Sequence, residues 1–147
     1  MTTEPGPVVR AVCGVVAVDP AGRVLMVRRS DDGTWGLPGG GVDPGETWQA
    51  AAVRECQEET GWRVEVDGLL GIYSDPATQV HRYPDGSWRH FLGVVFTARA
   101  LERTGEGDGE ALEVAFVDLD DLPAPLFAPD EPVLHDAAGR GASPHLR

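Results

Sequence analysis

The stretch from Leu37 to Trp62, LPGGGVDPGETWQAAAVRECQEETGW, decides the fold of this chain. Three successive glycines follow a proline. This pattern predicts unusual backbone angles or a close approach of the backbone to another group, so a plain helix or strand is not expected there. Thr47 is a good helix N-cap, helix-forming residues run from Trp48 to Thr60, and Gly61 is a natural stop. The stretch therefore predicts a glycine-rich loop that leads into one helix.

Three carboxylates share one face of this predicted helix. At about 100° per residue, Glu55, Glu58 and Glu59 fall within an arc of about 100°. The adjacent arc carries residues that can face a core, namely Ala52, Val53, Cys56 and Thr60. Like charges at this spacing repel one another, and the chain contains no lysine to offset them. A hard divalent cation explains the cluster, and a solvated acidic helix face is the alternative.

The preceding loop favours the cation. No side chains cover the backbone of Gly39, Gly40 and Gly41, so their carbonyls and amides are available to a magnesium ion or to substrate phosphates. Glu46 adds a carboxylate just before the helix. The glycines, this glutamate and the helix face together predict one compact site for a metal ion and a phosphate group.

These residues resemble the signature of the Nudix hydrolases, G-x5-E-x7-R-E-U-x-E-E-x-G-U, in every fixed position. The fixed residues are, in order, Gly40, Glu46, Arg54, Glu55, Glu58, Glu59 and Gly61. Cys56 and Trp62 stand where aliphatic residues are usual, and we expect these departures to alter packing without loss of the metal site. The resemblance implies an α/β fold of the family's kind, an α/β/α sandwich with a mixed, mainly antiparallel central sheet.

The resemblance also implies a role for each residue of the signature. Glu55, Glu58 and Glu59 would be metal ligands, and the Gly39 carbonyl would be a further ligand. One carboxylate, Glu55 or Glu58, would be the base that activates water. The metal would be Mg²⁺, with Mn²⁺ as a substitute, and neither an organic cofactor nor a covalent intermediate is needed.

Other residues would support the site or complete it. Arg54 would belong to the catalytic set by fixing the orientation of a carboxylate, and together with Glu46 it would brace the loop against the helix. Gly61 would give structural support at the end of the helix. Family members also draw an acid from a downstream loop, for which Glu110 is the first candidate metal ligand and Glu113 the alternative.

The rest of the chain limits the classes of function. Its 147 residues suit one domain over residues 1–147, with flexible termini at 1–7 and 139–147. The formal net charge of −12 disfavours binding to a nucleic-acid polymer, and no apolar run is long enough for a membrane helix. Cys13 and Cys56 are typical of buried thiols in a reducing compartment, and no secretory signal precedes them, so we expect a cytoplasmic protein.

Hydrophobic patterning predicts the other elements. Strands are expected at Val8–Val18 (buried on both faces), Val24–Arg28, Val64–Tyr73 (with a bend near Gly68), Trp88–Ala100 and Leu112–Val117. A hairpin turn is expected at Asp19–Gly22, turn-rich loops at Ser74–Ser87 and Thr104–Glu110, and a last helix at Asp130–Ala138.

Several side chains are candidates for contact with substrate. Arg28 and Arg29 would meet phosphates, although a solvated strand edge is an equal alternative, and Gly40 and Gly41 would offer backbone amides. Trp35, beside the glycines, is the best candidate to stack on a base, although aromatic residues in small domains usually lie in the core. The weaker stacking candidates are Tyr73, Trp88 and Phe91.

Three functions remain open. The first is hydrolysis of a small nucleotide, a nucleoside diphosphate linked to another group such as ADP-ribose or a nucleotide sugar. Pro76 lies near the position of a proline in ADP-ribose-cleaving relatives. The second is a nucleoside triphosphate pyrophosphatase that cleanses the nucleotide pool. The third is a non-catalytic nucleotide sensor, which the intact carboxylates disfavour. A homodimer is one open assembly state.

Overall fold

The computed structural model describes residues 6–139 and 144–147. The strands are β1 (Val8–Val18), β2 (Val24–Arg28), β3 (Trp35–Gly36), β4 (Gly39–Gly41), β5 (Trp62–Tyr73), β6 (Val80–Arg82), β7 (Trp88–Arg103), β8 (Glu113–Val117) and β9 (His145–Leu146). The helices are α1 (Trp48–Thr60), α2 (Pro76–Gln79), the short 3-10 helix η1 (Ala128–Asp130) and α3 (Glu131–Ala138). None of the helices in these two ranges has the length and hydropathy needed to cross a bilayer.

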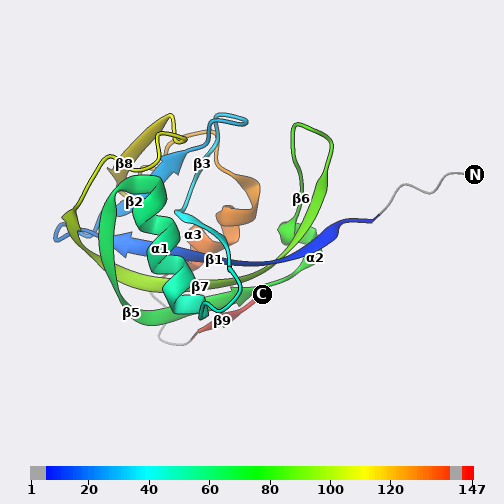
Figure 1. Ribbon diagram of the computed structural model, residues 1–147, viewed down its shortest axis with the longest axis horizontal. Helices are drawn as coiled ribbons and strands as arrows, with labels where there is room; N and C mark the ends of the chain where they lie inside the picture. The colour runs from blue at the N-terminus through cyan, green and yellow to red at the C-terminus, as the bar shows by residue number, and fades with distance from the viewer. Residues whose placement is uncertain (1–5, 140–143) are drawn as a thin grey trace, which may run out of the picture.

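The strands form one mixed sheet (Figure 1). Its main path runs β3-β2-β1-β7-β5-β9, and β4, β6 and β8 pair with β1, β7 and β2 respectively. The β1–β7 and β5–β9 pairs are parallel, and the remaining strand pairs are antiparallel. The expected α/β fold with a mixed, mainly antiparallel sheet is confirmed.

The alternation of side chains along β1 divides the core into two layers. Val15 and Ala17 pack in one cluster with Cys56 of α1. Val16, between them, packs in a different cluster with Val133 of α3. Because successive strand residues point to opposite faces, each helix covers its own face of the sheet. Figure 1 shows α1 in front of the central strands and α3 behind them.

Helix α1 has the boundaries that the sequence predicts. The Thr47 hydroxyl accepts a hydrogen bond from the Ala50 amide at 3.0 Å, and Gly61 ends the helix in the left-handed conformation at φ 76°. Its buried residues, Ala51, Ala52, Cys56 and Thr60, include three of the four expected on that face, and Val53 is half-buried. Both cysteines are free and buried as expected, and burial raises the pKa of Cys56 to about 12.

Two expectations for the first part of the chain are wrong in part. β1 is buried only from Cys13 to Ala17, because the clusters beneath the two helices reach no farther toward its N-terminal end. Gly39–Gly41 form a short strand without positive φ angles, so the glycines serve close approach and not unusual backbone angles. A Cβ atom on Gly39 would overlap the Cys13 carbonyl oxygen.

Two expectations for later segments are also wrong in part. The predicted loop Ser74–Ser87 contains α2 and β6, and β6 forms a hairpin with β7. The predicted flexible tail includes β9, and Arg147, the residue after β9, donates 2.9 Å and 3.3 Å hydrogen bonds to the buried Asp136 carboxylate. Residues 140–143 of that tail, and residues 1–5 of the expected flexible N-terminus, lie outside the described residues.

Candidate active site

The sheet brings the glycine strand against the carboxylate face of α1. β4 pairs with β1, placing Gly40 opposite Cys13, whose thiol donates to the Gly40 carbonyl at 3.4 Å. A Cβ atom on Gly40 would lie 2.7 Å from the Glu55 carboxyl carbon. Only glycine allows this approach, so the strand backbone and the Glu55 carboxylate meet directly.

Arg54 ties the loop before the helix to the helix itself. Its Nε and Nη2 donate to the two oxygens of Glu46 at 2.7 Å and 2.8 Å, and Nη2 also donates to the Gly41 carbonyl at 3.1 Å. The hydrogen bonds from Arg54 to the Glu46 carboxylate lower the pKa of Glu46 to about 2. On the other side, Nη1 donates to Glu55 and Glu58, each at 3.1 Å. One guanidinium therefore orients three carboxylates.

The three helix carboxylates differ in environment. Glu59 is half-buried. Burial, the charge of Glu55 and a hydrogen bond with it raise the pKa of Glu59 well above its usual range, against the opposing effect of the Gly39 amide. The Glu55 side chain is 19% exposed, and the Glu58 side chain is 54% exposed. Glu59 is thus the carboxylate of this face whose charge the fold disfavours, and Glu58 is more accessible to solvent than Glu55.

The Gly39 carbonyl opens toward the same carboxylates. Gly39 lies opposite Gly14, next to a ladder hydrogen bond from the Val15 amide to the Pro38 carbonyl at 3.1 Å. A residue in such a non-hydrogen-bonded pair turns both backbone groups away from the partner strand. Because the Gly39 amide donates to Glu59, the Gly39 carbonyl also points toward the carboxylates of α1.

This donor set fits a hard cation, which takes carboxylate and carbonyl oxygens. No group of three or more His, Cys, Asp or Glu side chains within residues 6–139 and 144–147 forms a ready-made metal cluster. Arg54 accounts for part of this, because it binds Glu55 and Glu58 and draws them toward Glu46. The residues that would hold Mg²⁺ are thus gathered in one place, and their carboxylates have not converged.

The downstream loop docks on the end of α1 through Asp108, a residue that was not among the two acids suggested by the sequence, Glu110 and Glu113. The Asp108 amide donates to the Glu58 carbonyl at 2.7 Å, and the negative charge of Asp108 contributes to the raised pKa of Glu59. Glu110 is exposed, and the Glu113 carboxylate pairs with Arg28 at 3.6 Å. Sequence spacing carried no signal for Asp108, because the loop is placed by its docking on the end of α1.

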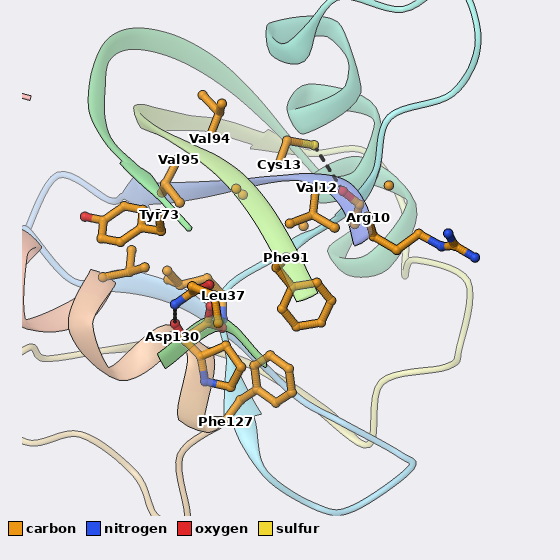
Figure 2. Close-up of a pocket in the computed structure, with 18 of the residues that line it drawn as sticks. Arg10, Val12, Cys13, Leu37, Tyr73, Phe91, Val94, Val95, Phe127 and Asp130 are labelled. Carbon is orange, nitrogen blue, oxygen red and sulfur yellow. Dashed lines mark hydrogen bonds between the residues drawn. The ribbon is translucent and has the colours of Figure 1, made fainter. Parts of the chain in front are cut away.

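A cavity of about 290 Å³ lies beside the glycine strand, on the α3 face of the sheet (Figure 2). β1 and β7 contribute its floor, and Gly39–Gly41 border it. Its aromatic lining includes Phe91, Phe127 and Tyr83. The Arg29 guanidinium lies 4.1 Å from the Phe127 ring centroid. Flat rings and a cation beside exposed backbone make a site for a planar ligand with phosphates.

The predicted substrate contacts fall in different places. Arg29 lines the cavity, as do Gly40 and Gly41. The Arg28 guanidinium instead bonds the Gly33 carbonyl at 3.3 Å and pairs with Glu113. Trp35 is 9% exposed in the core beneath α3 and does not line the cavity, which corrects its expected role in stacking. The short β2–β3 pairing turns its ring inward.

Sequence reasoning missed two polar residues of the cavity. Asp130 accepts a 2.8 Å hydrogen bond from the Leu37 amide, 93 positions away, and burial raises its pKa to about 6. Gln79 is buried and donates to the Pro129 carbonyl at 2.9 Å. The only available signal was the proline-rich composition around them, which indicates turns and no chemistry.

Comparisons with known proteins agree with this geometry. The model of the NUDIX domain matches residues 8–137. A MutT-like protein of Streptomyces ambofaciens is 35% identical over 93% of this chain and 80% of its own length. An ADP-ribose pyrophosphatase of Methanocaldococcus jannaschii is 37% identical over 80% of this chain and 66% of its own length. The crystal structure of an ADP-ribose pyrophosphatase from Streptococcus suis superposes with a TM-score of 0.70 at 25% identity, covering 94% of this chain and 97% of that one.

Proposed function

The chain belongs to the NUDIX family and is a pyrophosphohydrolase, and from this premise we propose that it cleaves a nucleoside diphosphate linked to a second group, as in ADP-ribose or a nucleotide sugar. One observation carries the proposal. Gly40 both borders the aromatic cavity and meets Glu55, so a base in the cavity would place its phosphates at the carboxylates.

Each residue of the site would have a separate role in metal binding or catalysis. Glu55, Glu59 and the Gly39 carbonyl would hold Mg²⁺, or Mn²⁺ in its place, with Glu58 completing the set. Bound there, the cation would supply charge neutralisation for the pyrophosphate and a lowered pKa for bound water. Glu58 or Glu55 would accept the proton of the attacking water, and Arg54 would keep both carboxylates oriented. Asp108, in place of Glu110 or Glu113, would be the downstream acid.

The cavity would hold the nucleoside. Stacking on Tyr83, Phe91 or Phe127 accepts any base, and the Gln79 amide and the Asp130 carboxyl supply polar contacts that can select one. Pro76 opens α2, the helix that carries Gln79 to the cavity. Two of the similar proteins are named ADP-ribose pyrophosphatases, which supports a diphosphate-linked substrate, whereas a similar protein of Bacillus subtilis is named a putative 8-oxo-dGTP diphosphatase, which keeps a triphosphate as the alternative.

The test is kcat/KM for ADP-ribose, ADP-glucose and the common nucleoside triphosphates under identical magnesium. We expect AMP and ribose 5-phosphate from ADP-ribose, and triphosphates poorer by about tenfold or more, or about 1.4 kcal/mol in transition-state binding. A faster triphosphate with pyrophosphate as product would establish the pool-cleansing alternative. Failure to hydrolyse any of them would favour a nucleotide sensor.

A further inference from the structure

The arginines of this acidic chain are unevenly paired. Within residues 6–139 and 144–147, all but three of them form ion pairs of 3.9 Å or less with a carboxylate. The exceptions are Arg10, Arg82 and Arg89, and two of these, Arg10 and Arg89, line the cavity. In a chain with a formal charge of −12, two cations left without carboxylates at one cavity are available to an anion from outside.

The two cavity arginines lie close together at one end. Arg10 of β1 pairs with Phe91 of β7 in the parallel ladder, and Arg89 precedes Phe91 by two residues, on the same face of the strand. Figure 2 shows the Arg10 side chain extending past Phe91, away from the end marked by Tyr73. The side chains of Arg10 and Arg89 therefore both neighbour Phe91 on this face, toward the end of the cavity farthest from Tyr73.

Other contacts of these arginines leave most of their donors unused. The Arg10 and Arg89 Nη1 atoms each donate one 3.2 Å hydrogen bond to the preceding carbonyl. Arg89 also lies 5.7 Å from the Tyr83 ring centroid. Asp85, the acid whose pKa Arg89 helps to lower, is already bound by the Ser87 amide and hydroxyl at 2.8 Å and 2.6 Å. A guanidinium has five donors, so both groups can still bind a phosphate.

We propose that Arg10 and Arg89 bind a phosphate monoester of the substrate that is separate from the scissile pyrophosphate. The proposal rests on the proposed function, in which the pyrophosphate lies at the carboxylates of α1. It names the substrate class as nucleoside diphosphate derivatives with one additional phosphate. That phosphate can stand on the ribose of the nucleoside or on the second group, and the binding experiment distinguishes these two positions.

A binding experiment tests this without turnover. Isothermal titration in excess chelator compares AMP with adenosine 2′,5′-bisphosphate, and ribose 5-phosphate with ribose 1,5-bisphosphate. For one of these pairs we expect the bisphosphate to bind at least about tenfold more tightly, because charge-assisted hydrogen bonds to a phosphate are strong. The pair that shows the difference identifies which end of the substrate carries the phosphate.

Variants connect the effect to the two arginines. Arg10→Gln and Arg89→Gln should each reduce the preference for the bisphosphate over the monophosphate severalfold. The control Arg82→Gln should leave this preference unchanged. Arg82 also has no carboxylate partner among the described residues, but it stacks on Trp88 and does not line the cavity. The proposal fails if neither bisphosphate is preferred, if the preference survives in both variants, or if Arg82→Gln removes it equally.

Turnover separates this proposal from the proposed function. With ADP-ribose and its 2′- and 1″-phosphates as substrates, the preference for one phosphorylated form should appear in kcat/KM and fall in Arg10→Gln and Arg89→Gln. An equal loss on all three substrates would assign the arginines to the scissile pyrophosphate and overturn the proposal while the hydrolase function stands. Absence of hydrolysis would count against the proposed function alone, because the titrations still decide the phosphate site.

Discussion

The two ends of the proposed site, which we call the metal end and the nucleoside end, are built in different ways. The metal end is assembled from neighbours in the sequence: Gly39 to Glu59 supply the glycine strand, the brace and all three helix carboxylates. The nucleoside end is assembled from β1, β7, the β6–β7 hairpin and the segment around η1, which lie far apart in the chain. A short motif can encode the metal end because one helix sets its geometry. The nucleoside end exists only after the sheet has formed.

This difference predicts separate kinetic effects. Changes at the metal end should lower kcat, because they act on the chemical step. Changes at the nucleoside end should raise KM, because they remove binding that the ground state and the transition state share.

Removal of divalent metal should have the largest effect. In excess chelator we expect hydrolysis to fall to background, and millimolar Mg²⁺ should restore it. The cation should also raise the melting temperature, because it binds the native state and relieves the repulsion between Glu55 and Glu59. Steady-state rates and thermal melts with and without EDTA check this, and full activity in EDTA would contradict the metal site outright.

Glu58→Gln should lower kcat by about 10² to 10⁴, the usual cost of losing an acid–base group. The side chain is 54% exposed, and its ion pair is with Arg54 at the surface of α1, so the fold should be retained. The matched control is Glu65→Gln, which removes a similarly exposed glutamate that is ion-paired with Arg99. Retention of more than half of the wild-type kcat would exclude Glu58 from the chemistry.

Tyr83→Ala should raise KM by about tenfold and leave kcat nearly unchanged, since stacking on a base contributes about 1–3 kcal/mol. Tyr83→Phe keeps the ring and should retain the wild-type KM. Initial rates over a range of ADP-ribose concentrations provide the measurement. If Tyr83→Ala instead lowered kcat at unchanged KM, the separation between the two ends of the site would be wrong.

Asp130→Asn should produce the smallest effect, one of a few degrees in melting temperature. Burial raises the pKa of Asp130 to about 6, so the fold favours its protonated form. The stability contributed by this carboxyl is fully present below its unfolded pKa, and it declines as the pH rises through about 6. The variant should therefore gain stability over wild type between pH 4 and pH 8, as seen in parallel thermal melts. A constant difference across that range would argue against the titration of Asp130.

Sequence reasoning succeeded where chemistry and geometry are local. The bounds of α1, its cap at Thr47 and its stop at Gly61 follow from side-chain preferences within a few residues. It failed for Trp35, whose ring the β2–β3 pairing turns into the core, and for Ser74–Ser87, where β6 forms only because β7 is there to pair with it.

What the sequence by itself determined is the carboxylate face of α1 and its glycine partner, because a helix of known period converts spacing directly into direction. What only the tertiary structure decided is the docking of Asp108 on the end of α1, the hydrogen bond between Asp130 and Leu37, and the placing of Arg10 and Arg89 at one end of the cavity. These contacts depend on strand register and on loop docking. Both are set by packing among residues far apart in the chain, and no local spacing encodes them.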